Sequence, residues 1–180
     1  LGIEYLGHQN DVLSRCGHMK LFSKGHSRRM NNAICGETGN EKITLGDYRY
    51  TTGHTKNRRH HSQTVCVLQS DRLNVPHCFL RPEVAFFDSI GSLLGGQDID
   101  FADDPAFSGA YVLQGDSEVV VREFFDADIR AWFAERRGRG FHVEFRGDTL
   151  VFHTGKSREP DEAKQLMQQA LEILNVLAKG

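Results

Sequence analysis

Four carboxylates gather in a short stretch of the sequence where they have the chemistry to hold a metal ion. They are Asp98, Asp100, Asp103 and Asp104. Carboxylate oxygens suit Mg²⁺ and Ca²⁺, and a bound cation can activate water for hydrolysis. The calcium-loop pattern fails, because Ala102 stands at a ligand position and no Gly or terminal Glu follows in step. Two interpretations stay open: a metal-dependent hydrolase that takes a histidine from elsewhere in the fold, or solvated carboxylates that cap turns before Pro105.

A second cluster combines histidines with basic residues between two strand-like segments. We predict Lys56, Arg58, Arg59, His60 and His61 as contact residues for a partner or a membrane. Histidine binds transition metals and acts as a general base, but no carboxylate or cysteine stands at ligand spacing near His54, His60 and His61. Adjacent residues of a strand also point to opposite faces. A basic hairpin tip indicates contact with something negative, with ordinary solvation as the alternative.

Two other basic segments allow the same interpretation. They cover residues 20–29, with Lys20, Lys24, Arg28 and Arg29, and residues 136–139. On an anionic membrane surface each Lys or Arg contributes about 1 kcal/mol. Charge that serves only solubility is the alternative for each segment.

No nucleophile has a base placed beside it by the sequence pattern. Cys78 follows His77, but neighbours in a strand face apart. Cys16, Cys35, Cys66 and Cys78 form no CxxC pair. We expect reduced core thiols, with two disulfides as the alternative. Phosphate-binding, dinucleotide-binding and hydrolase motifs are absent from the sequence, so we expect no cofactor.

Charge and length limit the class of protein. The chain has 180 residues, with 22 Lys and Arg against 24 Asp and Glu, and a formal net charge of −2. This balance argues against a nucleic-acid binder, as does the lack of aromatic residues among the tip bases. No apolar run approaches ~18 residues. The sequence begins Leu1-Gly2-Ile3 without Met, which suggests a piece of a longer protein.

The first half of the sequence predicts strands. A short helix over residues 11–19, an extended piece at 20–22 and a loop at 23–29 come first. Strands at residues 30–37, 42–52 and 60–69 then form an antiparallel meander, with Thr38-Gly39-Asn40 as a tight turn. A shorter extended segment covers residues 77–80.

The second half alternates helices with strands. Apolar residues at helical spacing predict helices at 82–95, at 116–136 with Asp116 as a cap, and at 160–178. Strands are predicted at 110–114, 141–145 and 149–154, the last two joined by Gly147-Asp148. The order indicates an α+β domain over residues 1–180: a mostly antiparallel sheet with an N-terminal meander, a C-terminal hairpin and three main helices packed on it.

Several short segments carry a family resemblance: residues 32–37, 45–50, 63–65, 76–83, 97–101, 107–108 and 121–125, from Asn32-Ala33-Ile34 to Glu123-Phe124-Phe125. Through these segments the sequence resembles the extramembrane domain of a family of bacterial membrane-anchored proteins of unknown function. The resemblance extends over about residues 2–177, nearly the whole chain. The resemblance implies a pair of hydrophobic segments before this domain and a place on the cytoplasmic side of a bacterial membrane. It implies no activity or catalytic residue.

The sequence therefore leaves two functions open. The first is a non-enzymatic, membrane-associated binding or interaction domain that contacts an anionic membrane surface or another protein, and no nucleic acid. The second is a metal-dependent hydrolase that uses Asp98, Asp100, Asp103 and Asp104. The sequence does not predict an oligomeric state.

Overall fold

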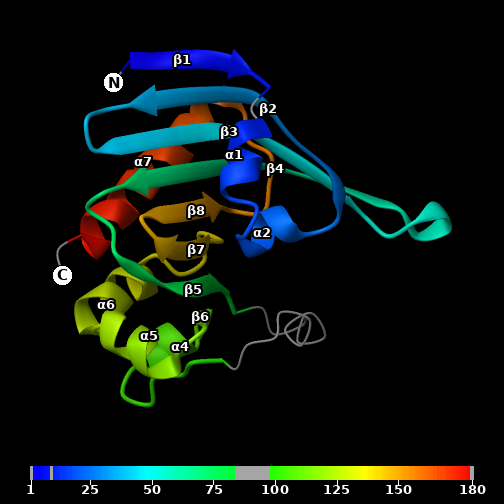
Figure 1. Cartoon of the computed structure of the whole chain (residues 1–180). Coiled ribbons are helices and arrows are strands. Elements are labelled where there is room, and N and C mark those ends of the chain that lie inside the picture. Colours follow the sequence, from blue (N-terminus) through cyan, green and yellow to red (C-terminus); the bar gives the residue numbers. More distant parts are fainter. Residues whose placement is uncertain (1, 9, 84–97, 179–180) are drawn as a thin grey trace.

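A computed structural model describes residues 2–8, 10–83 and 98–178 of the chain (Figure 1). The strands of these ranges form one antiparallel sheet in the order β1-β2-β3-β4-β8-β7-β5-β6. They are β1 (Gly2–Gly7), β2 (His26–Glu37), β3 (Glu41–Thr52), β4 (Arg59–Ser70), β5 (Val75–Pro82), β6 (Tyr111–Gly115), β7 (His142–Gly147) and β8 (Thr149–His153). The helices are α1 (Asn10–Arg15), α2 (Lys20–Ser23), α4 (Pro105–Ser108), α5 (Glu118–Phe124), α6 (Ala127–Glu135) and α7 (Pro160–Leu177), with a 3-10 turn η1 (Thr55–Asn57).

The arrangement confirms the predicted α+β class. Strands β2, β3 and β4 form the meander, and β7 and β8 form the C-terminal hairpin across Gly147 and Asp148. The sequence pattern did not reveal β1, which extends the meander by pairing with β2. No helix in the described ranges is long and apolar enough to cross a membrane.

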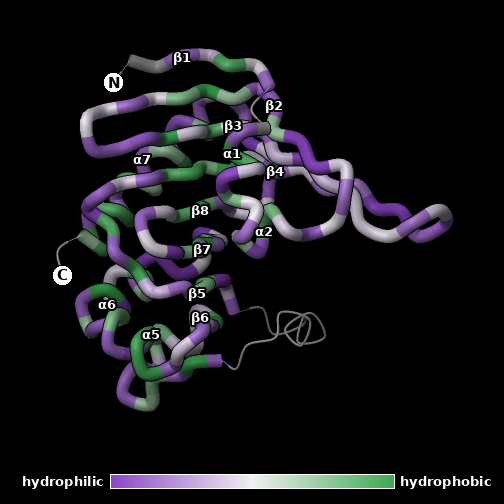
Figure 2. The backbone as a smooth tube through the Cα atoms, in the orientation of Figure 1, coloured by the Kyte–Doolittle hydropathy of each residue, from purple (hydrophilic) through white to green (hydrophobic). Residues whose placement is uncertain are grey.

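Helices pack on both faces of the sheet. On one face, α7 lies across β3, β4 and β8 (Figure 1), and its Leu166, Ala170 and Ile173 share a buried cluster with Leu68 and Phe152. Helices α4, α5 and α6 extend this cluster around β5 and β6. On the other face, α1 and α2 close a second cluster over the meander. Figure 2 shows the hydrophobic residues concentrated on the inner strands and helices, where their removal from water stabilises the fold.

Strand β2 begins earlier than predicted. The loop predicted at residues 23–29 is wrong for residues 26–29, which pair with β3. Register shifts interrupt this pairing after His26 and after Asn31. Two non-glycine residues near the shifts, Ser27 and Asn32, have positive φ angles of 54° and 50°. Such bulges interrupt the alternation of apolar and polar residues, so the sequence pattern of a strand is lost there.

Two helical predictions also need correction. The extended piece predicted at residues 20–22 is α2, whose first N–H groups bind the carboxylate of Glu144 on β7. The single helix predicted at 116–136 is two helices, because Asp126 accepts a hydrogen bond from the N–H of Ile129 and starts α6 anew. Ser117, not Asp116, is the N-cap residue of α5. The helix predicted at 82–95 lies outside the described residues, apart from its first two positions.

The start of β2 depends on Gly25. This glycine has a φ of +62°, and a Cβ atom placed on it would overlap the carbonyl oxygen of Thr51 on β3. We expect Gly25→Ala to lower the free energy of unfolding by about 2 kcal/mol, because positive φ and steric overlap both act against alanine. Gly39→Ala is the matched control, since a Cβ there meets nothing within 4 Å. Equal stability of the two variants in urea denaturation would contradict this role for Gly25.

Candidate functional site

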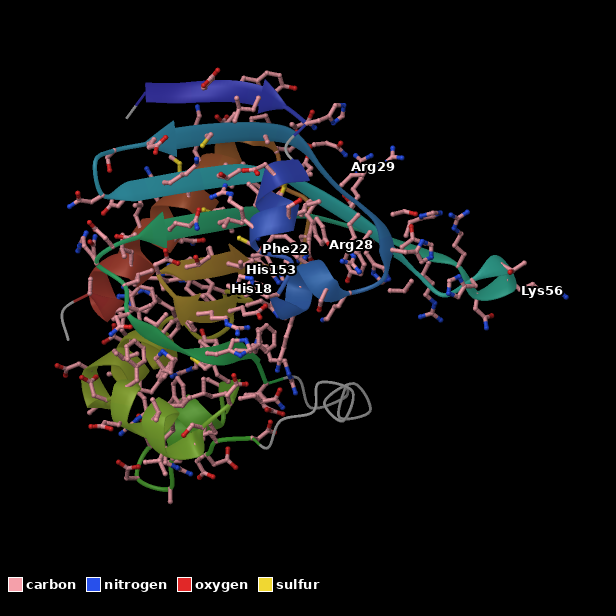
Figure 3. All side chains as sticks on the ribbon, in the orientation of Figure 1. His18, Phe22, Arg28, Arg29, Lys56 and His153 are labelled. Carbon is pink, nitrogen blue, oxygen red and sulfur yellow. The ribbon has the colours of Figure 1, made fainter. Side chains whose placement is uncertain are left out.

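A basic arm projects from the body of the protein. It consists of residues 26–29 of β2 and residues 50–61 of the β3–β4 hairpin, whose tip stands clear of the sheet (Figure 1). Its cationic residues are Arg28, Arg29, Lys56, Arg58 and Arg59, and it also carries His26, His54, His60 and His61. No Asp or Glu lies in either segment. Figure 3 shows Arg28, Arg29 and Lys56 along this arm.

Backbone pairing continues from the body into the arm without interruption. Strands β3 and β4 pair through 12 consecutive residues each, from Glu41 opposite Ser70 to Thr52 opposite Arg59. Aromatic rings on one face of the β3–β4 hairpin also stack in a row that leads from the body toward the tip. The ring of Tyr48, which is buried, stacks 5.4 Å from that of Tyr50, and Tyr50 stacks 4.6 Å from His61. These contacts extend the order of the core toward the tip.

The five predicted contact residues fall into two groups. Lys56, Arg58 and Arg59 are exposed, and none of them forms an ion pair within the described part of the chain. His60 and His61 instead contact strand β3. The Nδ1 atom of His60 lies 3.2 Å from the hydroxyl of Thr51, and the Nε2 atom of His61 lies 2.8 Å from that of Thr52. The cations are therefore available at the surface, whereas the histidines support the hairpin.

The three basic segments of the sequence do not form one surface. Arg28 and Arg29 join the tip residues on the arm (Figure 3). Residues 136–139 follow α6 at a different part of the molecule (Figure 1), where Arg136 packs 3.9 Å from the Trp132 ring. One sequence feature accompanies the grouping of Arg28 and Arg29 with the tip: residues 12–36 and 48–70 contain no acidic residue.

Two of the four predicted metal-binding carboxylates pair with a buried arginine. The Nη2 and Nε atoms of Arg130 donate to Asp103 and Asp104 at 3.1 and 3.0 Å. Asp104 also accepts from the N–H of Phe107 and thereby caps α4. Arg130 stacks 4.3 Å above the ring of Phe101. These contacts give Asp103 and Asp104 a structural role.

The other two carboxylates, Asp98 and Asp100, differ from this pair in their surroundings. Asp98 accepts a hydrogen bond of 2.8 Å from the side-chain amide of Gln114, and Asp100 is exposed. Among the described residues, no group of three or more His, Cys, Asp or Glu side chains is arranged to hold a metal ion. The structure thus does not bring the four aspartates together as one ligand set.

His77 and Cys78 lie on opposite faces of β5, as the strand pattern predicts. His77 stands between two carboxylates: its Nδ1 atom is 2.8 Å from Asp116 and its Nε2 atom 3.4 Å from Glu144. Cys78 belongs to the buried cluster beneath α5, where burial raises the pKa of its thiol. The described structure holds all four cysteines unbonded. A thiol with a raised pKa that faces away from the histidine is a poor nucleophile.

Two histidines with lowered pKa values pair across the C-terminal hairpin; His153 is buried and His142 is half-buried. His142 on β7 and His153 on β8 are direct cross-strand partners, with ring centroids 4.8 Å apart. Burial lowers the pKa of His142 to about 4 and holds the pKa of His153 well below its ordinary value. The neighbouring Lys24 adds to both effects, and burial lowers its own pKa as well. The Nδ1 atom of His153 accepts the N–H of Gly155, which the neutral ring permits.

The described residues thus define an antiparallel α+β protein with a projecting cationic hairpin. The sequence matches no protein-family model and no curated protein. The fold is similar to the crystal structure of the mycobacterial trehalose monomycolate transport factor A, TtfA. The TM-score is 0.67 at 11% sequence identity, and the match covers 98% of this chain and 87% of that chain. This similarity shows a shared fold with a bacterial protein; the membrane anchor implied by the sequence resemblance stays a prediction.

The histidine pair predicts acid sensitivity. Because the folded pKa values lie below the unfolded value of about 6.5, the unfolded chain gains protons first as the pH falls. The free energy of unfolding should therefore decrease from pH 6.5 down to about 4. The double variant His142→Gln/His153→Gln should show a shallower decrease in thermal melts over this range. His18→Gln, at an exposed histidine, is the control and should keep the wild-type slope. Identical slopes for all three proteins would refute the assignment.

Proposed function

We propose that this protein is a non-enzymatic binding domain that rests on an anionic membrane surface through its basic arm. The arm carries five Lys and Arg residues and no acidic residue, and this observation supports the proposal most directly. We propose further that the domain is the soluble part of a longer anchored protein on the cytoplasmic side of a bacterial membrane. The cytoplasmic leaflet carries the anionic lipids that such an arm attracts.

The distribution of charge supports an oriented contact. Of the 22 Lys and Arg residues, five lie on the arm, so the remaining chain has 17 cationic residues against all 24 acidic ones. An anionic surface therefore attracts the arm and repels the rest of the molecule on average. Both effects act within about 8 Å at physiological salt. The arm extends beyond the body (Figure 1), so its cations can reach the surface first.

The comparison with TtfA supports a binding role in transport. That protein is a transport factor for trehalose monomycolate according to its name. We propose that this chain likewise acts by binding, to a membrane surface and to a partner in transport, without chemistry of its own. No contact among the described residues favours the alternative metal-dependent hydrolase, since Asp103 and Asp104 pair with Arg130.

Vesicle flotation tests the role of the arm. We expect the wild-type protein to bind phosphatidylcholine vesicles that contain phosphatidylglycerol. It should not bind vesicles of phosphatidylcholine alone. The triple variant Lys56→Glu/Arg58→Glu/Arg59→Glu should bind the anionic vesicles about 100-fold more weakly, because each lost cation removes about 1 kcal/mol. The weakening should shrink as salt is added.

The control is a charge reversal of equal size away from the arm. Arg137, Arg139 and Arg146 are exposed, and Arg137→Glu/Arg139→Glu/Arg146→Glu changes the net charge by the same amount. It should retain most of the binding. Equal losses in both triple variants would mean that net charge alone governs binding and would contradict a specific arm. If the protein bound a short single-stranded DNA and bound no vesicles, the arm would instead be a nucleic-acid contact.

A further inference from the structure

A groove of about 550 Å³ opens at the root of the arm, on the face of the sheet that packs against α7. Its walls come from β1 to β4, from the segment before α7 and from the first turns of α7. Its volume lies in the range of pockets that hold small molecules. All residues that line it belong to the described part of the chain. The predicted contact residues of the arm lie outside the groove.

The floor of the groove is apolar. Leu45 is 3% exposed and belongs to the main buried cluster, and the half-buried Ile34 and Ala163 pack against that cluster. Pro160, at the first position of α7, adds a further apolar wall. Ile34 and Ala163 are half-buried and Pro160 is exposed, so these three residues leave apolar area that an alkyl chain can cover. Burial of such a chain is favourable in proportion to the apolar area removed from water.

One end of the groove is polar and centred on Asp47. Its Oδ2 atom accepts the amide of Asn32 at 2.9 Å, and its Oδ1 atom accepts the hydroxyl of Thr64 at 3.0 Å. Both donors are neutral, and Asp47 forms no ion pair among the described residues. A carboxylate has about four acceptor sites, so each oxygen keeps capacity for another donor. The bulge at Asn32, with its positive φ, brings this amide to the carboxylate.

The remaining groups around this end favour hydroxyl groups over a charged head. The hydroxyls of Ser62 and Ser157 are hydrogen-bonded to each other at 3.1 Å, and the pair keeps one free O–H donor and further acceptor sites for a ligand. The lining contains two acidic and three basic residues, and two of the basic ones, Arg158 and Lys164, are already paired with Glu162 and Asp161. Mixed charge of this kind selects neither an anion nor a cation. The ring of Tyr5 is 67% exposed at the mouth, where it offers a flat apolar surface to a sugar ring.

We propose that the groove binds a single-chain amphiphile with an uncharged, hydroxyl-rich head. The alkyl chain lies on Ile34, Ala163 and Pro160, above the buried Leu45. Hydroxyl groups of the head donate to Asp47, and the Tyr5 ring covers one face of the head. This assignment follows from the lining of the groove and does not depend on the membrane role of the arm.

Calorimetric titration with three probes of equal chain length tests the proposal. The probes are dodecyl maltoside, dodecylphosphocholine and dodecyl sulfate, each kept below its micelle concentration. We expect the wild-type protein to bind dodecyl maltoside more tightly than the zwitterionic dodecylphosphocholine. The comparison with the anionic dodecyl sulfate uses the variant Lys56→Glu/Arg58→Glu/Arg59→Glu, so that the arm does not contribute to binding, and dodecyl maltoside should again bind more tightly. Asp47→Asn should weaken maltoside binding about tenfold, because hydroxyl groups lose a charged acceptor, and should leave dodecylphosphocholine unchanged. No binding, or equal affinity for the three heads, would overturn the proposal.

Variants that fill the groove give a second readout. Ala163→Trp should abolish binding of dodecyl maltoside, whereas Ala131→Trp, at an exposed alanine of α6, should bind as the wild type does. Circular dichroism checks that both variants fold. If Ala163→Trp does not fold, the maltoside affinity of Asp47→Asn still tests the proposal. The arm variant Lys56→Glu/Arg58→Glu/Arg59→Glu should bind the detergent normally, so failure of the groove and failure of the arm are distinguishable. Wild-type affinity in folded Ala163→Trp would refute the site.

Discussion

The ladder between β3 and β4 is the constraint on which the rest of the structure depends. Its inner rungs carry Leu45, Cys66 and Leu68 into the main buried cluster, where apolar burial stabilises the pairing. Its outer rungs carry exposed cations that contribute no such burial. The arm therefore holds its form because its backbone hydrogen bonds continue a pairing that the core has already fixed. A single register connects the core, the groove and the arm.

Polar groups outside the arm are largely occupied by structural contacts. Arg130 forms ion pairs with Asp103 and Asp104. The carboxylate of Glu144 contacts the ring of His77 and accepts hydrogen bonds from the first N–H groups of α2. A buried charge that lacked such partners would be costly, so these networks are expected of a stable fold. Among the cations of the arm, Arg28 donates to the carbonyl of Gly25, and none forms an ion pair within the described chain. Asp47 has only neutral partners. Both proposed sites therefore keep polar capacity for other molecules.

The sequence predicted those elements whose signals are local. Alternating residues and a Gly-Asp turn marked β7 and β8, and one long apolar stripe marked α7. It missed features that depend on distant contacts: α2 begins against Glu144, more than a hundred residues away, and the bulges of β2 hide its pairing with β3. The tip cations were visible in the sequence. Arg28 and Arg29 were visible as a separate basic segment, and the pairing of β2 with β3 places them beside the tip. The groove was not predicted, because the strands and the helix that form it lie far apart along the chain.

Amide hydrogen exchange of residues 48–52 and 59–63 tests most directly whether the arm is an ordered continuation of the sheet. We expect the hydrogen-bonded amides of these segments to exchange at least about tenfold more slowly than in an unstructured peptide, though faster than those of residues 43–47 in the core. Exchange of the arm at unprotected rates, while residues 43–47 stay protected, would contradict this expectation. The arm would then be a disordered basic segment, and the continuous ladder would not position its charges.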